Sequence, residues 1–159
     1  MSHQASVERF AAGGTALAGA IKGLSREDLL AFPVPGTWSI QQIVVHTLDS
    51  DLVASHRMKR IIAEERPLLI AYDETAFARS LHYEAEDLTV ACELFRLNRV
   101  QMAGILRRLP DSAFERVAIH NQNGKMTLGG VVEGYVAHLE HHLRFMREKR
   151  ALLGKPLAG

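Results

Sequence analysis

Apolar residues recur at every third or fourth position along four long stretches of the chain, a spacing that places them on one face of a helix. The four stretches are residues 7–22, 40–65, 86–109 and 128–152. In the first, Gly13, Gly14 and Gly19 lower the helix propensity. Amphipathic helices of this length bury their apolar faces against one another, so the pattern predicts an all-α four-helix bundle.

Start and stop signals support these boundaries. Ser39 followed by Gln42 has the capping-box spacing, in which each side chain bonds the backbone N–H of the other residue. The same pattern at Ser25 predicts a short helix over residues 26–32. The remaining signals are Thr127 as the cap of the last helix and Pro33, Pro67 and Pro110 as helix stops.

The second and third helices are joined by a link, residues 67–85, with room for one short helix after Asp73. Because this link is longer than a simple bundle turn, the third helix need not be the antiparallel neighbour of the second. Asn123-Gly124 between two short apolar runs, residues 117–120 and 125–127, predicts a β-hairpin before the last helix. We expect one domain over residues 1–153 and a flexible tail over 154–159.

The helical period also predicts which side chains face inward. The expected inward residues are Ile43, His46, Ser50, Val53 and Arg57 in the second helix; Val90, Leu94, Leu97, Gln101, Ile105 and Leu109 in the third; and Val131, Tyr135, His138, His142 and Phe145 in the last. Asp51 and Lys59 are expected to point to solvent.

Composition narrows the class of protein. With 159 residues, a net charge of +1 and scattered Lys and Arg, the chain offers no footprint for nucleic acid. No run is long enough to span a membrane. The single cysteine, Cys92, excludes an internal disulfide and fits a reducing compartment, so we expect a cytoplasmic protein. Cys92 lies among apolar residues and is predicted to be a buried core residue.

His138 and His142 are four residues apart, which puts both imidazoles on one face of the last helix. Two histidines so placed can bind one metal ion, although histidines are also common on helix surfaces. His46 is a third candidate on the inward face of the second helix. Three histidine ligands leave a coordination position open, the arrangement of a catalytic metal site.

Imidazole ligands suit zinc, nickel, iron and copper about equally, so the ligand type does not select the metal. We expect one divalent ion per chain, zinc or nickel. Asp49, adjacent to His46 and one turn further on, is the candidate catalytic residue. It could orient His46 or act as a general base, or it could be a surface carboxylate.

These residues resemble the DinB superfamily and, within it, the YfiT-like branch. The motifs that carry the resemblance are, in order, Trp38-Ser39, His46 with Asp49 and Ser50, Arg57 with Lys59, Tyr72-Asp73-Glu74, Thr127-Leu128 and His138 with His142. They span roughly Pro35 to Leu153. Phe77 departs from the pattern, since a tryptophan is expected there, and this puts a pocket wall or a dimer contact in doubt.

The resemblance implies a four-helix bundle with a divalent metal held by His46, His138 and His142. Members are described as metal-dependent hydrolases, relatives transfer thiols such as bacillithiol, mycothiol or glutathione, and YfiT-like members are often homodimers. Arg57 could then meet the carboxylate of such a thiol, but pairing with Asp73 or Glu74 is the simpler expectation. We therefore predict a metal-dependent enzyme that transfers a low-molecular-weight thiol, bacillithiol-like, to small electrophiles. The alternatives are a hydrolase acting through metal-bound water and a non-catalytic, dimeric metal-binding protein.

Overall fold

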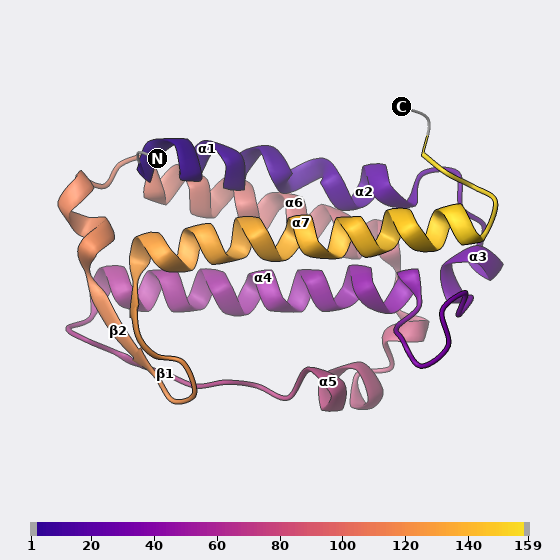
Figure 1. The fold of residues 1–159 in the computed structure, drawn as a ribbon. Coiled ribbons are helices and arrows are strands. Elements are labelled where there is room, and N and C mark those ends of the chain that lie inside the picture. Colours follow the sequence, from indigo (N-terminus) through magenta and orange to yellow (C-terminus); the bar gives the residue numbers. More distant parts are fainter. Residues whose placement is uncertain (1–2, 158–159) are drawn as a thin grey trace.

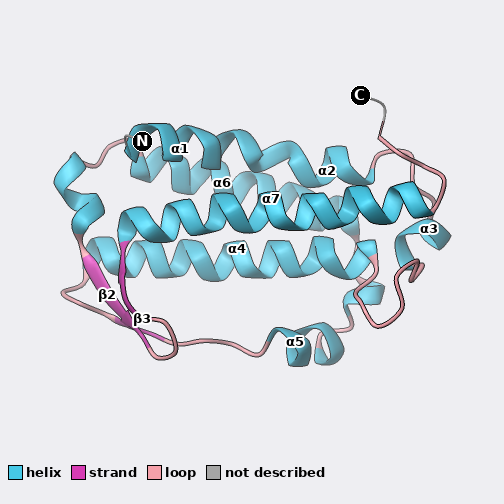
Figure 2. Cartoon of the chain, viewed as in Figure 1, coloured by secondary structure: helices cyan, strands magenta, loops and turns pink. Residues whose placement is uncertain are grey.

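The computed structural model describes residues 3–157 and confirms the predicted four-helix bundle with a small sheet before the last helix (Figures 1 and 2). The long helices are α1 (His3–Ala12) continued by α2 (Ala16–Ile21), α4 (Ile40–Ala63), α6 (Leu88–Leu106) and α7 (Leu128–Leu152). Shorter helices are α3 (Arg26–Leu30) and α5 (Glu74–Ser80), and 3-10 turns cover Gly13–Thr15, Tyr83–Ala85 and Asp111–Glu115. No helix within residues 3–157 combines the length and apolar character needed to cross a bilayer.

Most of the predicted helix ends are confirmed. The side chain of Ser39 accepts a hydrogen bond from the backbone N–H of Gln42, and the Gln42 side chain returns one to Ser39, so α4 begins with a complete capping box. Ser25 and Asp28 form the same arrangement at α3. The Thr127 hydroxyl accepts from the N–H of Gly130 and caps α7.

The link after α4 sets the order of the bundle. In Figure 1 it runs back along the length of the bundle, so α6 starts at the same end as α4 and runs parallel to it. The helix α4 packs against α6 and α7, and α1 packs against the same two helices from the other side of the bundle. The third helix need not be the antiparallel neighbour of the second, as the length of the link indicated, and here it is parallel to it.

The predicted hairpin is present as β2 (Val117–His120) and β3 (Gly124–Thr127), paired antiparallel. The sequence did not predict the third strand, β1 (Leu68–Leu69), which pairs in parallel with β2 so that Leu69 lies opposite His120. The N–H of Ala71 also bonds the side-chain oxygen of Asn121. These bonds hold the start of the link against the hairpin.

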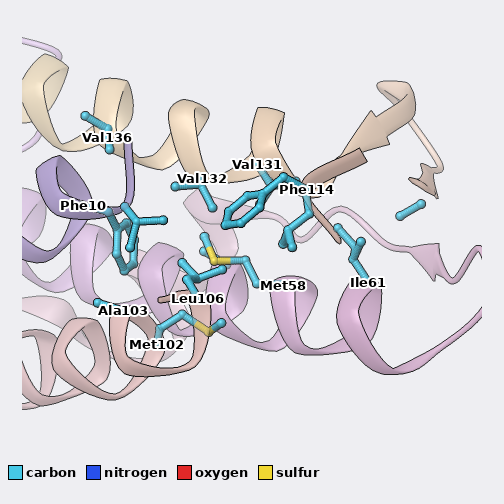
Figure 3. Packing of buried hydrophobic residues seen from close by; sticks show 14 of the residues in the cluster. Phe10, Met58, Ile61, Met102, Ala103, Leu106, Phe114, Val131, Val132 and Val136 are labelled. Atoms are coloured by element: carbon cyan, nitrogen blue, oxygen red, sulfur yellow. The ribbon is translucent and has the colours of Figure 1, made fainter. Parts of the chain in front are cut away.

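The core has two parts along the bundle. Figure 3 shows one of them, where Phe10, Met58, Leu106, Phe114 and Val132 meet from different elements. The second part lies around the other half of the bundle and includes Leu17, Val44, Phe95 and Met146. Cys92 belongs to it and is buried, as predicted.

Over Val90 to Gln101 the predicted inward face of α6 is wrong, whereas Ile105 and Leu109 are partly buried and pack against the core, as predicted. Val90, Leu94 and Leu97 are about half exposed, at 54%, 46% and 47%, and Gln101 is exposed too. The face that packs into the bundle instead carries Leu88, Ala91, Cys92, Phe95, Arg99, Met102, Ala103 and Leu106. Apolar residues lie on both faces of this helix, and the arginine in the middle of the true core face makes it look polar in the sequence.

Arg99 also explains a second error, the expectation that Asp51 faces solvent. Both side chains are 1% exposed, and the Arg99 guanidinium donates to the two carboxylate oxygens of Asp51 at 2.8 and 3.0 Å. The guanidinium lies over the rings of Phe10 and Phe95. From the sequence alone, a single charged residue on a helix is expected to face solvent. Asp51 is buried because its partner, Arg99, comes from another helix, which the local pattern does not reveal.

The first predicted helix, residues 7–22, is interrupted by the 3-10 turn Gly13–Thr15, and Arg99 approaches the backbone at this point. Arg99 Nη1 donates to the carbonyl of Phe10, close to the point where α1 ends. A side chain at Gly13 would meet Arg99 Nη1 at 2.5 Å, so this close approach requires glycine.

The division into one domain over residues 1–153 and a flexible tail over 154–159 stays a prediction. Residues 1–2 and 158–159 lie outside the described part of the chain. Of the expected tail, Lys155 contacts α3 through an ion pair with Asp28.

Candidate metal centre

Three histidine side chains from two helices meet between α4 and α7. His46 comes from α4, and His138 and His142 come from successive turns of α7. The Nε2 atom of His138 lies 3.3 Å from Nε2 of His46 and 3.1 Å from Nε2 of His142. These are the three residues that the sequence predicts as metal ligands, and each offers a ligand atom within 4.8 Å of the others.

His141, the alternative on the same helix, does not join this cluster. It is exposed, its ring centroid lies 4.7 Å from that of Phe145, and its Nδ1 contacts Arg144. The predicted surface position of His141 is confirmed. Metal binding by His142 stays a prediction, supported by this geometry.

The surroundings keep all three imidazoles neutral. Burial, with repulsion from His138, lowers the pKa of His46 to about 4. Burial also lowers the pKa of His138 to about 4 and that of His142 to about 3, with smaller contributions from neighbouring histidines and, for His138, from Arg99. A neutral imidazole is the form that ligates a metal.

The spacing of the three Nε2 atoms suits ligation of a divalent cation better than it suits hydrogen bonds between the imidazoles. A neutral Nε2 has either one lone pair or one hydrogen, so that of His138 cannot make a well-aligned hydrogen bond with both neighbours. Two nitrogens that each lie about 2.1 Å from one tetrahedral zinc ion are about 3.4 Å apart, close to the two separations observed here. An all-imidazole set suits zinc, nickel, iron and copper alike.

Asp49, the predicted catalytic residue, does not contact His46 by a hydrogen bond. Its carboxylate accepts a 2.5 Å hydrogen bond from the hydroxyl of Tyr83, a buried residue at the end of the link. The Nδ1 atoms of His46 and His142 have no hydrogen-bond partner within residues 3–157. The structure therefore lends no support to Asp49 as the residue that orients His46, and its role as a general base stays a prediction.

An apolar pocket of about 290 Å³ reaches the cluster at His142. Trp38, Ile43 and Phe145 supply its wall, and the centroid of the Trp38 ring lies 4.7 Å from that of His46. Glu148 and Lys149 also line it, and the Lys149 ammonium donates to the Thr37 hydroxyl. Such a pocket favours an uncharged, flat or branched ligand.

A second, polar pocket of about 280 Å³ reaches the cluster at His138 and shares no lining residue with the first. Its polar lining residues are Ser50, Arg57, Tyr72, Glu74, His120, Gln122, Asn123 and Tyr135. The predicted pairing of Arg57 with Asp73 or Glu74 is absent from the described residues. Arg57 instead donates to the Tyr135 hydroxyl and to the carbonyl of Ile70. Lys59 is exposed, as expected, and bonds Gln101.

The sequence did not single out His120 as a functional residue. It ends the first strand of the hairpin, and nothing in a four-residue strand indicates what its side chain meets. The unexpected pairing of β1 with β2 brings the link against this strand, and both contribute to the polar pocket. Phe77, the departure from the family pattern, contacts Tyr72 of the same pocket, with 4.8 Å between the ring centroids.

Comparison with known proteins agrees with this architecture. The family model described as the DinB superfamily matches residues 9–146, a span that covers most of the chain and includes the positions of the three histidines. The chain belongs to the DinB superfamily. The resemblance inferred from the order of the motifs is thereby confirmed.

Among the relatives of this DinB-superfamily chain, one from Oceanobacillus iheyensis is named "Putative metal-dependent hydrolase OB0782". It is 29% identical over 120 residues, which cover 76% of this chain and 69% of the relative. "Putative metal-dependent hydrolase YfiT" from Bacillus subtilis is 28% identical over 120 residues, or 75% of this chain and 67% of that protein. The solved structure of YfiT superposes with a TM-score of 0.90 at 24% identity, over 96% of this chain and 87% of YfiT. It is described as an unusual four-helix bundle, and the likeness shows the shared fold.

Proposed function

We propose that this chain is a divalent-metal-dependent enzyme that transfers a low-molecular-weight thiol to small electrophiles. The observation that carries the proposal is the pair of pockets, one polar and one apolar, that reach the histidine cluster through different histidines. Transfer between two molecules needs two binding places beside the reacting atoms, because catalysis depends on holding both in position. Hydrolysis needs one such place and water.

The residues of the chain divide this work. His46, His138 and His142 would hold the ion, which would act as a Lewis acid and lower the pKa of a thiol bound beside it. Trp38 and Phe145 would hold the electrophile and exclude water from it. In the transfer, the thiol sulfur forms a bond to the electrophilic carbon, the leaving group departs with its bonding electrons, and the thiol proton goes to solvent.

Metal-dependent hydrolysis is the second candidate, and the names of the relatives favour it. Hydrolysis predicts cleavage of an ester or amide with no thiol present. A non-catalytic metal-binding protein, the third alternative, predicts no turnover of either kind of substrate.

The thiol is expected to come from outside the chain. Burial raises the pKa of the Cys92 thiol to about 11, and Cys92 lies on α6, which supplies none of the three histidines. We expect Cys92→Ser to retain conjugation of glutathione to the fluorogenic electrophile monochlorobimane, within about twofold of the wild type. Chelation of the metal is expected to abolish it.

The same assay separates the candidates. It is run with and without thiol, and in parallel with a chromogenic ester. Ester turnover in thiol-free buffer, without thiol conjugation under any condition, would contradict the transferase and favour the hydrolase. Activity lost in Cys92→Ser at unchanged metal content would contradict the external thiol.

We also propose that the protein forms a homodimer through α6. Val90, Leu94, Leu97 and Val100 are each about half exposed and follow one another at three- and four-residue spacing along this helix. An apolar row this long is unusual on the surface of a monomer. Because the row carries no charge, it can pack against its own copy across a twofold axis.

Leu97→Glu is expected to shift the protein from dimer to monomer in sedimentation experiments, because it places two carboxylates in the interface. Leu81→Glu is a matched control, since Leu81 is 50% exposed but lies outside α6. A wild-type protein that is monomeric at assay concentrations would contradict this interface.

A further inference from the structure

The polar pocket contains a cationic side chain with unused donors. Arg57 Nη1 donates to the Tyr135 hydroxyl at 3.1 Å and Nη2 to the Ile70 carbonyl at 2.8 Å. A guanidinium has five N–H donors, so these two bonds leave three. Within residues 3–157 no carboxylate lies at ion-pair distance from Arg57.

Neutral donors surround it. His120 is 4% exposed, and its Nδ1 accepts from the backbone N–H groups of Gln122 and Asn123 at 3.2 Å each. An accepting Nδ1 is unprotonated, so the hydrogen of the neutral ring is on Nε2, which bonds nothing within the described residues. The Tyr135 hydroxyl accepts from Arg57, so its own hydrogen is free to donate as well.

The buried hydroxyl of Tyr72 is a further group of this kind. It lines the pocket, and although Ser50 lies near it, no hydrogen bond of normal geometry joins them. Burial lowers the pKa of His120, and the positive charge of the nearby Arg57 guanidinium lowers it further. Of these donors, the Tyr72 hydroxyl is buried without a partner among the described residues, which is costly unless a ligand supplies an acceptor.

We propose that this pocket binds the carboxylate of the thiol substrate, with Arg57 as the charged contact and His120, Tyr135 and Tyr72 as neutral donors. The identity of the ligand as a thiol rests on the proposed function. The presence of an anion site does not depend on that function. Glu74 also lines the pocket and is exposed, and its charge opposes an anion. One cation facing one acidic residue favours a singly charged carboxylate over a phosphate dianion.

The geometry also limits the length of the ligand. Tyr135 connects the two ends of the pocket, since its hydroxyl contacts Arg57 while its ring centroid lies 5.8 Å from that of His138. We therefore infer a ligand that extends along Tyr135 from Arg57 to His138, and we take two extended residues, which span ~7 Å, as its minimum length. The substrate class is a carboxylate-bearing thiol of dipeptide size.

The test uses two thiols that differ only in the carboxylate, N-acetylcysteinylglycine and its carboxamide. Binding of each is measured by calorimetry to metal-loaded and to chelator-treated protein, with inorganic phosphate as a third probe. The wild type is expected to bind the acid about tenfold to a hundredfold more tightly than the amide, the range for hydrogen bonds to a charged group.

Arg57→Gln is expected to abolish this preference and leave binding of the amide unchanged. Arg57→Lys, which keeps the charge but loses the planar fork, is expected to retain part of it. Glu74→Gln is expected to strengthen binding of the acid. Arg60→Gln is the matched control, because Arg60 lies on the same helix and bonds the carbonyl of Leu68, but it does not line the pocket.

Equal affinity for acid and amide in the wild type, no binding of the acid, or an unchanged preference in Arg57→Gln would overturn the carboxylate site. Tighter, Arg57-dependent binding of phosphate would overturn the choice of carboxylate. An Arg57-dependent preference in a protein that shows no thiol conjugation would preserve the site and contradict the proposed function. Thiol conjugation with no preference for the acid would support the proposed function and contradict the carboxylate site.

Discussion

Replacing any one of His46, His138 and His142 by alanine is expected to remove the bound metal. The three Nε2 atoms face one another, so loss of one leaves two imidazoles, too few to hold the ion against buffer and chelators. We expect elemental analysis to find about one divalent ion per wild-type chain and about a tenth of that or less in each variant. Thiol conjugation is expected to fall with the metal.

His141→Ala is the matched control, because it removes a neighbouring imidazole from the same helix that does not face the cluster. It is expected to retain the full metal content. If His141→Ala lost the metal while His142→Ala kept it, the assignment of ligands on α7 would be wrong. Full metal content in His46→Ala would remove α4 from the site.

The largest effect on stability is expected from breaking the ion pair between Asp51 and Arg99. Asp51→Ala leaves a guanidinium buried without its carboxylate, and removal of one partner of a buried pair costs about 3–5 kcal/mol of unfolding free energy. For a chain of this size that lowers the melting temperature by about 6–20 °C. Calorimetry or urea denaturation measures both quantities.

Glu93→Ala is the control for this prediction, since Glu93 pairs with Arg96 on the exposed side of α6. It is expected to cost at most about 1 kcal/mol. The double variant of Asp51 and Arg99 is expected to cost less than the sum of the two single variants, because neither residue then leaves the other uncompensated. A cost for Asp51→Ala no larger than for Glu93→Ala would show that the pair does not stabilise the fold.

The bundle could be predicted from the sequence because its signals are local. Capping residues, prolines and the 3.6-residue period depend on neighbours in the chain, and they placed α4 and α7 within a residue or two of their observed ends. The three histidines followed from the same period, since it assigns each to an inward helix face.

The errors came from contacts between distant parts of the chain. Arg99 on the core side of α6 is compatible with burial only because Asp51 of α4 meets it, and this pairing left the apolar row of Val90, Leu94 and Leu97 outside. The polar pocket was missed for a similar reason. The polar pocket depends on the pairing of β1 with β2, and this pairing could not be predicted because a strand of two residues is too short to show an alternating pattern.

The proposed function requires three histidines that hold a metal and an external thiol that binds to this metal. X-ray absorption at the metal edge tests it most directly, on metal-loaded Cys92→Ser with and without N-acetylcysteinylglycine. We predict three imidazole neighbours and no sulfur before the thiol is added, and three imidazoles with one sulfur afterwards. Fewer than three imidazoles would rule out the three-histidine site, and no sulfur at saturating thiol would rule out binding of the thiol to the metal.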